Sequence, residues 1–117
     1  MKIKTAKLEG VELDWAVAQA EGVQPFQWKW YRRAVATEDV GENVVQYYGY
    51  SQFWRAGGPI IERERIHISP SVEGGWSAYF AVDFDMLGIQ VGATPLIAAM
   101  RCYVASKLGA EVDVPTA

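Results

Sequence analysis

Aromatic and basic side chains are mixed in the first half of the chain, and together they have the chemistry to bind a nucleotide. Residues 28–33 read Trp-Lys-Trp-Tyr-Arg-Arg, and a second aromatic group at 47–50 precedes Trp54 and Arg55. Flat rings stack on bases, and guanidinium groups bind phosphates in a bidentate manner. The same residues also fit a pair of strands whose aromatic side chains pack the core. The sequence leaves both interpretations open.

Two further segments supply candidate anion contacts. Residues 62–65 read Glu-Arg-Glu-Arg, a pattern typical of a solvated face with mutual ion pairs. Arg63 and Arg65 become binding groups only if they point into a pocket shared with the aromatic rings. Thr94 marks the N-terminus of the last predicted helix, where free amides and the helix dipole favour an anion. The candidate ligand-binding residues are therefore Trp28, Trp30, Arg32, Arg33, Tyr50, Trp54, Arg55, Arg63, Arg65 and Thr94.

Residues suited to catalysis or metal binding are sparse. The single histidine, His67, lies between two isoleucines in an alternating segment, which is typical of a solvated strand residue. Gly57-Gly58-Pro59 lacks the lysine and the spacing of a phosphate-binding loop, and one histidine with one cysteine makes no zinc site. Asp83 and Asp85 fit the polar edge of a turn better than a cation site. We therefore expect no catalytic residues, no metal, no cofactor, and an action by binding.

Length and composition favour one intracellular domain. The chain has 117 residues, 50% of them hydrophobic, which suffices for a core within a single domain at 1–117. Its single cysteine, Cys102, fits a reducing cytoplasm, and no apolar run is long enough to span a membrane. The formal charge of −3 gives no general attraction to nucleic acid or acidic membranes.

The helices are predicted from their end signals. Thr94 as N-cap, Pro95 at the first helical position and Gly109 after the last turn delimit a helix that is apolar almost all round. Such a helix is expected between layers of the fold. A second helix at 11–21 has two apolar faces separated by polar residues that include Asp14. Its Trp15 is left to cover a loop, line a groove or join an interface.

Alternation and turn residues predict the remaining elements. The clearest is a hairpin of strands at 65–69 and 76–82, joined by turn residues at 70–75. The others are a short strand at 2–8, a variable aromatic-rich insertion at about 24–50 with strands at 26–30 and 44–50, a turn at 51–58, a short helix at 59–64, a loop at 88–92 and a loosely attached tail at 112–115.

Several segments of the chain resemble the NinX family of small proteins from lambdoid phages. They are residues 4–10 with 13–18, Gly-Gly-Pro-Ile-Ile-Glu-Arg-Glu at 57–64 with Ile66, Gly-Trp at 75–76, and the helix at 94–109. Residues 24–46 have no counterpart, and Gln52-Phe53 stands where the family pattern has a small polar or acidic residue. The element order is also similar to the phage α-β-α sandwich domain. The resemblance implies an α+β fold in which two main helices cover a small, mainly antiparallel sheet.

The resemblance implies no established activity, so the functional expectations rest on context and on the candidate residues. The leading expectation is a phage-encoded accessory protein in the bacterial cytoplasm, which inhibits host defence by sequestering a nucleotide-derived immune signal, in a homo-oligomer or alone. The alternative is a factor that binds a host or phage protein through an exposed aromatic patch, with Trp15 or the insertion as its anchor. A local nucleic-acid binder that uses residues 29–33 comes third.

Overall fold

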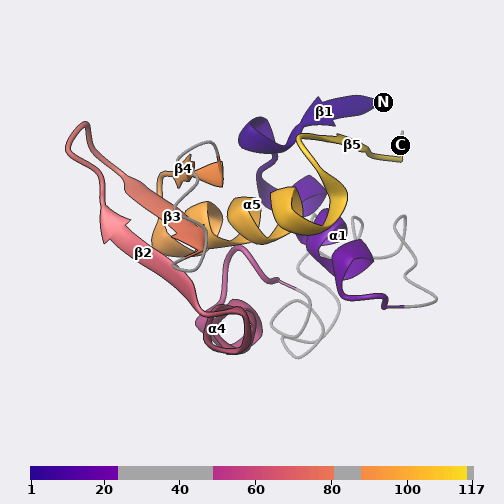
Figure 1. The fold of residues 1–117 in the computed structure, drawn as a ribbon. Coiled ribbons are helices and arrows are strands. Elements are labelled where there is room, and N and C mark those ends of the chain that lie inside the picture. The colour runs from indigo at the N-terminus through magenta and orange to yellow at the C-terminus, as the bar shows by residue number, and fades with distance from the viewer. Residues whose placement is uncertain (24–48, 81–87, 116–117) are drawn as a thin grey trace.

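The computed structural model describes residues 1–23, 49–80 and 88–115, which form an α+β structure as the sequence predicts (Figure 1). Its elements, in chain order, are β1 (Lys2–Lys4), the 3-10 helix η1 (Thr5–Lys7), α1 (Gly10–Ala20), α4 (Trp54–Glu64), β2 (Ile66–Pro70), β3 (Trp76–Phe80), β4 (Gln90–Gly92), α5 (Pro95–Leu108) and β5 (Glu111–Asp113).

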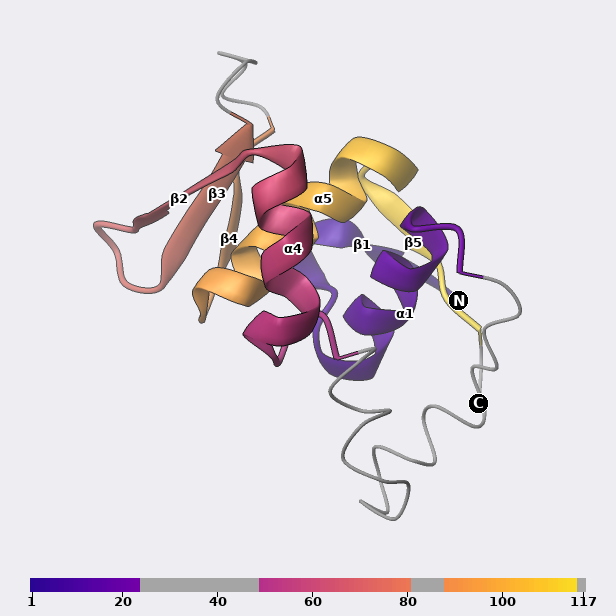
Figure 2. The same ribbon diagram turned by 90° about the horizontal axis from the view of Figure 1, so that it is seen from below.

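Helix α5 is the central element, as its apolar circumference predicts. It contacts β2, β3 and β4 on one side and α1 on another, while α4 packs across it (Figure 2). Its ends are those read from the sequence. The hydroxyl of Thr94 accepts a hydrogen bond of 3.1 Å from the amide of Ile97, and Gly109 has a φ of 93°. Local signals at both ends therefore define this helix.

Two small antiparallel sheets flank the helices. In the three-stranded sheet the order is β2-β3-β4, and Ile66, Ile68 and Pro70 pair with Phe80, Ala78 and Trp76. This is the predicted hairpin, although β2 begins one residue later than expected. Ile66 and Ala78 on the face toward α5 are buried, whereas His67 on the opposite face is exposed. The alternation of the two strands thus sets an inner and an outer face.

The second sheet joins the two ends of the chain and corrects two predictions. β1 pairs with β5, with Ile3 opposite Val112, so the tail at 112–115 is not loosely attached. Val112 and Val114 are buried, and this burial holds the tail in place. The strand expected at 2–8 ends at Lys4, because the chain then turns through η1 and Thr5 donates its hydroxyl to the Gly109 carbonyl.

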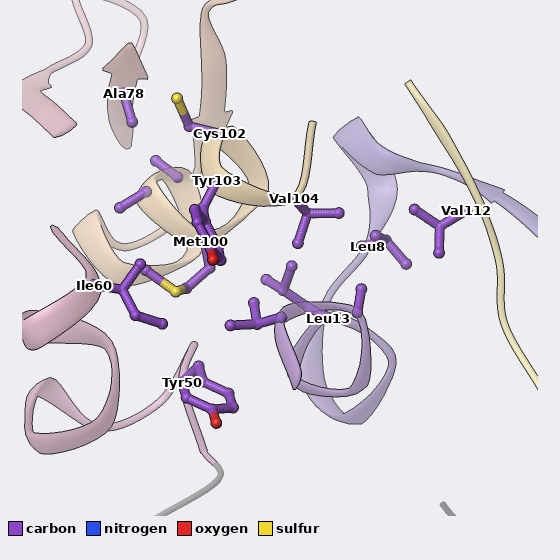
Figure 3. Close-up of a cluster of buried hydrophobic side chains, with 14 of the residues drawn as sticks. Leu8, Leu13, Tyr50, Ile60, Ala78, Met100, Cys102, Tyr103, Val104 and Val112 are labelled. Atoms are coloured by element: carbon purple, nitrogen blue, oxygen red, sulfur yellow. The ribbon is translucent and has the colours of Figure 1, made fainter. Parts of the chain in front are cut away.

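The core lies where α1, α4 and α5 meet. Figure 3 shows Leu13 of α1, Ile60 of α4 and Met100 of α5 pointing toward one another, with Tyr50 at the edge of the cluster. Leu8 and Val112 extend the same cluster to the β1–β5 sheet. One continuous core therefore joins the described elements.

Helix α4 corrects the prediction of a turn at 51–58 followed by a short helix. It begins at Trp54, so the glycine pair and Pro59 lie inside it. A Cβ at Gly57 would meet the carbonyl of Tyr50 and, at 2.7 Å, a methyl group of Leu96. Glycine is required there by close packing and not by a turn. The loop expected at 88–92 is also corrected, because it contains strand β4.

Some predicted elements lie outside the described residues. They are the strand at 26–30, most of the strand at 44–50, and the end of the strand at 76–82. Of the strand predicted at 44–50, the structure describes only Gly49 and Tyr50, and Tyr50 lies in a turn.

Candidate functional site

The outer surface of α4 carries two of the predicted binding residues, Trp54 and Arg55. We call the exposed side of this helix, made of Trp54, Arg55, Pro59 and Glu62, the α4 face. The opposite side of α4 is fixed in the core by Gly57 and Ile60. At about 100° and 1.5 Å per residue, Arg55 and Glu62 lie in line on this face and about 10 Å apart.

Trp54 and Arg55 are available for contact. Trp54 is 56% exposed, and its ring lies close to Gly58, since a Cβ there would be 3.9 Å from the indole. Arg55 is exposed, and within the described residues it has no ion pair. An exposed aromatic residue is therefore followed in the helix by a cation that has no counter-charge in the described part of the chain.

A buried carboxylate positions the start of α4. Asp14 is fully buried in α1 and accepts hydrogen bonds from the Ser51 amide at 2.8 Å, the Ser51 hydroxyl at 2.6 Å and the Gln52 side chain at 3.0 Å. An ionised carboxylate has only acceptor sites, which suits three donors. The residues that lead into α4 are thus tied to α1. Sequence reasoning missed this role and assigned Asp14 to a polar strip, because its partners lie 37 and 38 residues away.

Arg63 belongs to an ion-pair cluster at the other end of α4. It donates to both carboxylate oxygens of Glu21, at 2.9 and 3.1 Å, and to Glu64 at 3.3 Å. Its guanidinium also lies over the ring of Tyr103, 5.8 Å from the ring centre. The hydrogen bond to Glu21, supported by the one to Glu64, raises the pKa of Arg63 above its ordinary value. Arg63 therefore links the ends of α1 and α4 to Tyr103 of α5, and its charge is already paired.

Tyr103 completes this cluster from inside the core. Its hydroxyl donates to Glu21 at 3.1 Å and accepts from Arg63 at 3.3 Å. Burial, followed by the charge and the hydrogen bond of Glu21, raises the pKa of Tyr103 to about 12. The hydroxyl stays protonated at neutral pH, so it acts as a link between α1, α4 and α5.

The other described candidates do not converge with the α4 face. Tyr50 is buried in the core and so is not a surface ligand contact. Thr94 uses its hydroxyl to cap its own helix. Arg65 is exposed at the far end of α4, with a left-handed backbone at φ 55° and ψ 47°. Trp15, the other aromatic anchor considered, is half-buried against the core.

Four predicted site residues lie outside the described part of the chain: Trp28, Trp30, Arg32 and Arg33. The pair Asp83 and Asp85 lies outside it as well. Within residues 1–23, 49–80 and 88–115, no group of three histidine, cysteine, aspartate or glutamate side chains is arranged to hold a metal ion. In the same ranges no helix has the length and apolar character needed to cross a membrane.

Comparison with known proteins gives one family. No curated protein matches the chain. The model of the family described as bacteriophage P22 NinX matches residues 4–107, which is most of the chain and includes α1, α4, the β2–β3 hairpin and all but the last residue of α5. The resemblance predicted from the separate segments is thereby confirmed, and the chain belongs to the NinX family of bacteriophage proteins.

Proposed function

We propose that this chain is a phage accessory protein that acts by binding another protein through the α4 face. The observation that carries the proposal is the exposed ring of Trp54 beside Arg55, whose charge is unpaired among the described residues. Tryptophan and arginine are the residues most often found to dominate the energy of protein interfaces. Their position at the start of α4 therefore favours a contact surface over a solvated face.

The surroundings of Trp54 support such a contact because they hold the backbone that carries it in place. The core side of α4 packs through Gly57 and Ile60, and Asp14 fixes the residues that precede the helix. A helix whose backbone is already fixed loses little conformational freedom on binding, so more of the contact energy appears as affinity.

Charge on the α4 face specifies the chemistry of the partner. Arg55 and Glu62 lie on the same side of the helix, about 10 Å apart, and both are exposed. A complementary protein surface has an apolar recess for the indole, an acidic group opposite Arg55 and a basic group opposite Glu62. Glu62 makes the face unfavourable for a polyanion, which distinguishes this partner from nucleic acid.

Sequestration of a nucleotide-derived immune signal in the bacterial cytoplasm is the second proposal. It is supported by an exposed indole and, one residue further along α4, an exposed guanidinium, a combination that also suits a base and a phosphate. Against it stands the separation of the described candidate residues, because Arg63 is occupied by two carboxylates and Arg65 lies at the opposite end of α4.

The first experiment is affinity capture of the tagged chain from phage-infected bacteria, followed by identification of bound proteins and by mass spectrometry of small molecules released on denaturation. The Trp54→Ala and Arg55→Glu variants are compared with Val72→Ala. Val72 is the matched control because its side chain is fully exposed at the tip of the β2–β3 hairpin.

The outcomes separate the two proposals. Protein binding is supported if an identified protein is captured by the parent chain and by Val72→Ala, and is lost with Trp54→Ala and Arg55→Glu. Capture that survives both α4 substitutions overturns it. Release of an intact nucleotide, together with no protein that depends on Trp54, favours sequestration.

A further inference from the structure

The outer face of the β2–β3 hairpin carries an aromatic pair that the core does not use. His67 and Tyr79 are directly opposite each other across the two strands, on the side away from α5. Their rings are stacked, with centroids 4.5 Å apart and an angle of 24° between the planes. The next pair on this face is Ser69 and Ser77. Two rings thus stand beside two small hydroxyl groups on an accessible surface.

One side of this stack is open. Tyr79 covers one face of the His67 ring, and β2 is an edge strand, since the described residues pair it with β3 only. His67 is correspondingly exposed. A third flat ring placed against the exposed side of His67 would continue the stack. Aromatic stacking of this kind accepts any base because every base has a π-face.

A cation precedes the stack by two residues. Arg65 is exposed, and its side chain has no ion pair within the described ranges. It adopts the left-handed conformation at the end of α4, which glycine or asparagine adopts with less strain. The adjacent Glu64 is paired with Arg63 at 3.3 Å and with Lys107 at 3.7 Å, so its charge does not cancel that of Arg65.

We propose that the edge of β2 binds a nucleotide, with its base stacked on His67 and its phosphate bound by Arg65. The Ser69 and Ser77 hydroxyls are available to the sugar or the base edge. A free nucleotide and the end of a single strand share this chemistry. The site lies apart from the α4 face and uses different residues, so a negative result for one proposal does not bear on the other.

The single histidine of the chain makes the proposal directly measurable. In proton NMR at pH 7.5, only His67 contributes imidazole ring signals. The probes are AMP, a ten-residue oligoadenylate and, as a control, inorganic phosphate. Stacking of a base is expected to shift the imidazole signals upfield with AMP or the oligonucleotide, and phosphate alone is expected to leave them in place.

Variants test both contacts. Isothermal titration calorimetry gives the dissociation constant for variants that lack the imidazole. We expect His67→Ala and Arg65→Gly each to raise it at least tenfold, whereas Lys7→Ala, which removes an exposed cation outside both surfaces, leaves it unchanged. Loss of Arg65 should also reduce the salt dependence of oligonucleotide binding by about one unit in the log–log slope. Arg65→Gly suits the left-handed position and is expected to remain folded.

The two nucleotide probes also distinguish a free nucleotide from the end of a single strand. AMP binding as tight as that of the oligonucleotide indicates a free nucleotide, and binding of the oligonucleotide alone indicates a single strand. Imidazole signals that stay fixed at millimolar concentrations of both probes would overturn the proposal. Equal affinity of the parent chain and His67→Ala would overturn it as well.

Discussion

Replacing Asp14 by alanine is expected to lower the free energy of unfolding by about 3 kcal/mol. Asp14 is fully buried, and its carboxylate accepts from the Ser51 amide, the Ser51 hydroxyl and the Gln52 side chain. Ser51 is only 4% exposed, so its amide is left without its acceptor in a site with little access to water. An orphaned buried donor costs about 1–3 kcal/mol, and hydrogen bonds to a charged group are worth more than neutral ones. The removed carboxylate also leaves a small void.

Urea unfolding measures this loss, and amide hydrogen exchange locates it. The Ser51 amide should exchange faster in Asp14→Ala by more than the global destabilisation accounts for, because its acceptor is gone. Asp14→Asn keeps the shape of the side chain and one acceptor oxygen, and we expect it to lower the free energy of unfolding by about half as much as Asp14→Ala does. Gln19→Ala, at a partly exposed position near the end of α1, is the control and should change stability by less than about 0.5 kcal/mol. A loss below about 1 kcal/mol, with the Ser51 amide still protected, would refute the reasoning.

Three further predictions test close packing and the buried titratable groups. Gly57→Ala should lower the free energy of unfolding by about 2 kcal/mol or more, because its Cβ meets the Tyr50 carbonyl. Gly58→Ala should raise it by up to about 1 kcal/mol, because alanine favours the helix more than glycine does. Thermal melts that rank the two variants in the reverse order would contradict this prediction. Burial raises the pKa of the Cys102 thiol from 9.0 to about 11. The unfolded chain therefore loses this proton first, and the free energy of unfolding falls as the pH rises from about 9 to 11. Urea unfolding at pH 8 and 10 should show a loss of about 1 kcal/mol that Cys102→Ala removes, and an equal loss in the variant would count against it. The pKa of Tyr103 rises from 10.0 to about 12, so the free energy of unfolding that this residue contributes is lost between those two pH values. Tyr103→Phe should therefore make the free energy of unfolding less dependent on pH in this range. Ultraviolet titration that finds the Tyr103 phenol ionising near pH 10 in the folded chain would contradict the prediction.

Local signals were enough to predict the elements whose ends are decided within a few residues. Thr94, Pro95 and Gly109 specify α5 through capping, the first helical turn and a positive φ. The β2–β3 hairpin follows from strict alternation around a turn rich in glycine. In both cases the interactions that form the element join residues close together in the chain, so a short stretch of sequence is enough to predict it.

Features that depend on distant partners escaped prediction. The glycine pair of α4 indicates a turn when only neighbours are considered, yet Gly57 packs against Tyr50 and Leu96. The tail becomes β5 because β1, more than a hundred residues earlier, is its partner. The role of Asp14 depends on Ser51 in the same way. Tertiary contacts override local preference at these positions.

The structure places only some of the candidate site residues on the surface, and their role in binding stays a prediction. Trp54 and Arg55 are exposed together, as a binding role requires, while Tyr50, Arg63 and Thr94 serve the fold. The Glu-Arg-Glu-Arg segment was expected to form mutual ion pairs, and Arg63 does pair with Glu64. Its stronger partner, Glu21, lies 42 residues away and leaves no signal near Arg63 in the sequence.

The most direct test of the central claim is the dissociation constant of the purified chain with the purified protein that it captures, measured by isothermal titration calorimetry. If the α4 face is the contact, Trp54→Ala weakens binding by about 2 kcal/mol or more, which is roughly thirtyfold, and Val72→Ala leaves it unchanged. Equal affinities for the parent chain and Trp54→Ala would contradict the account.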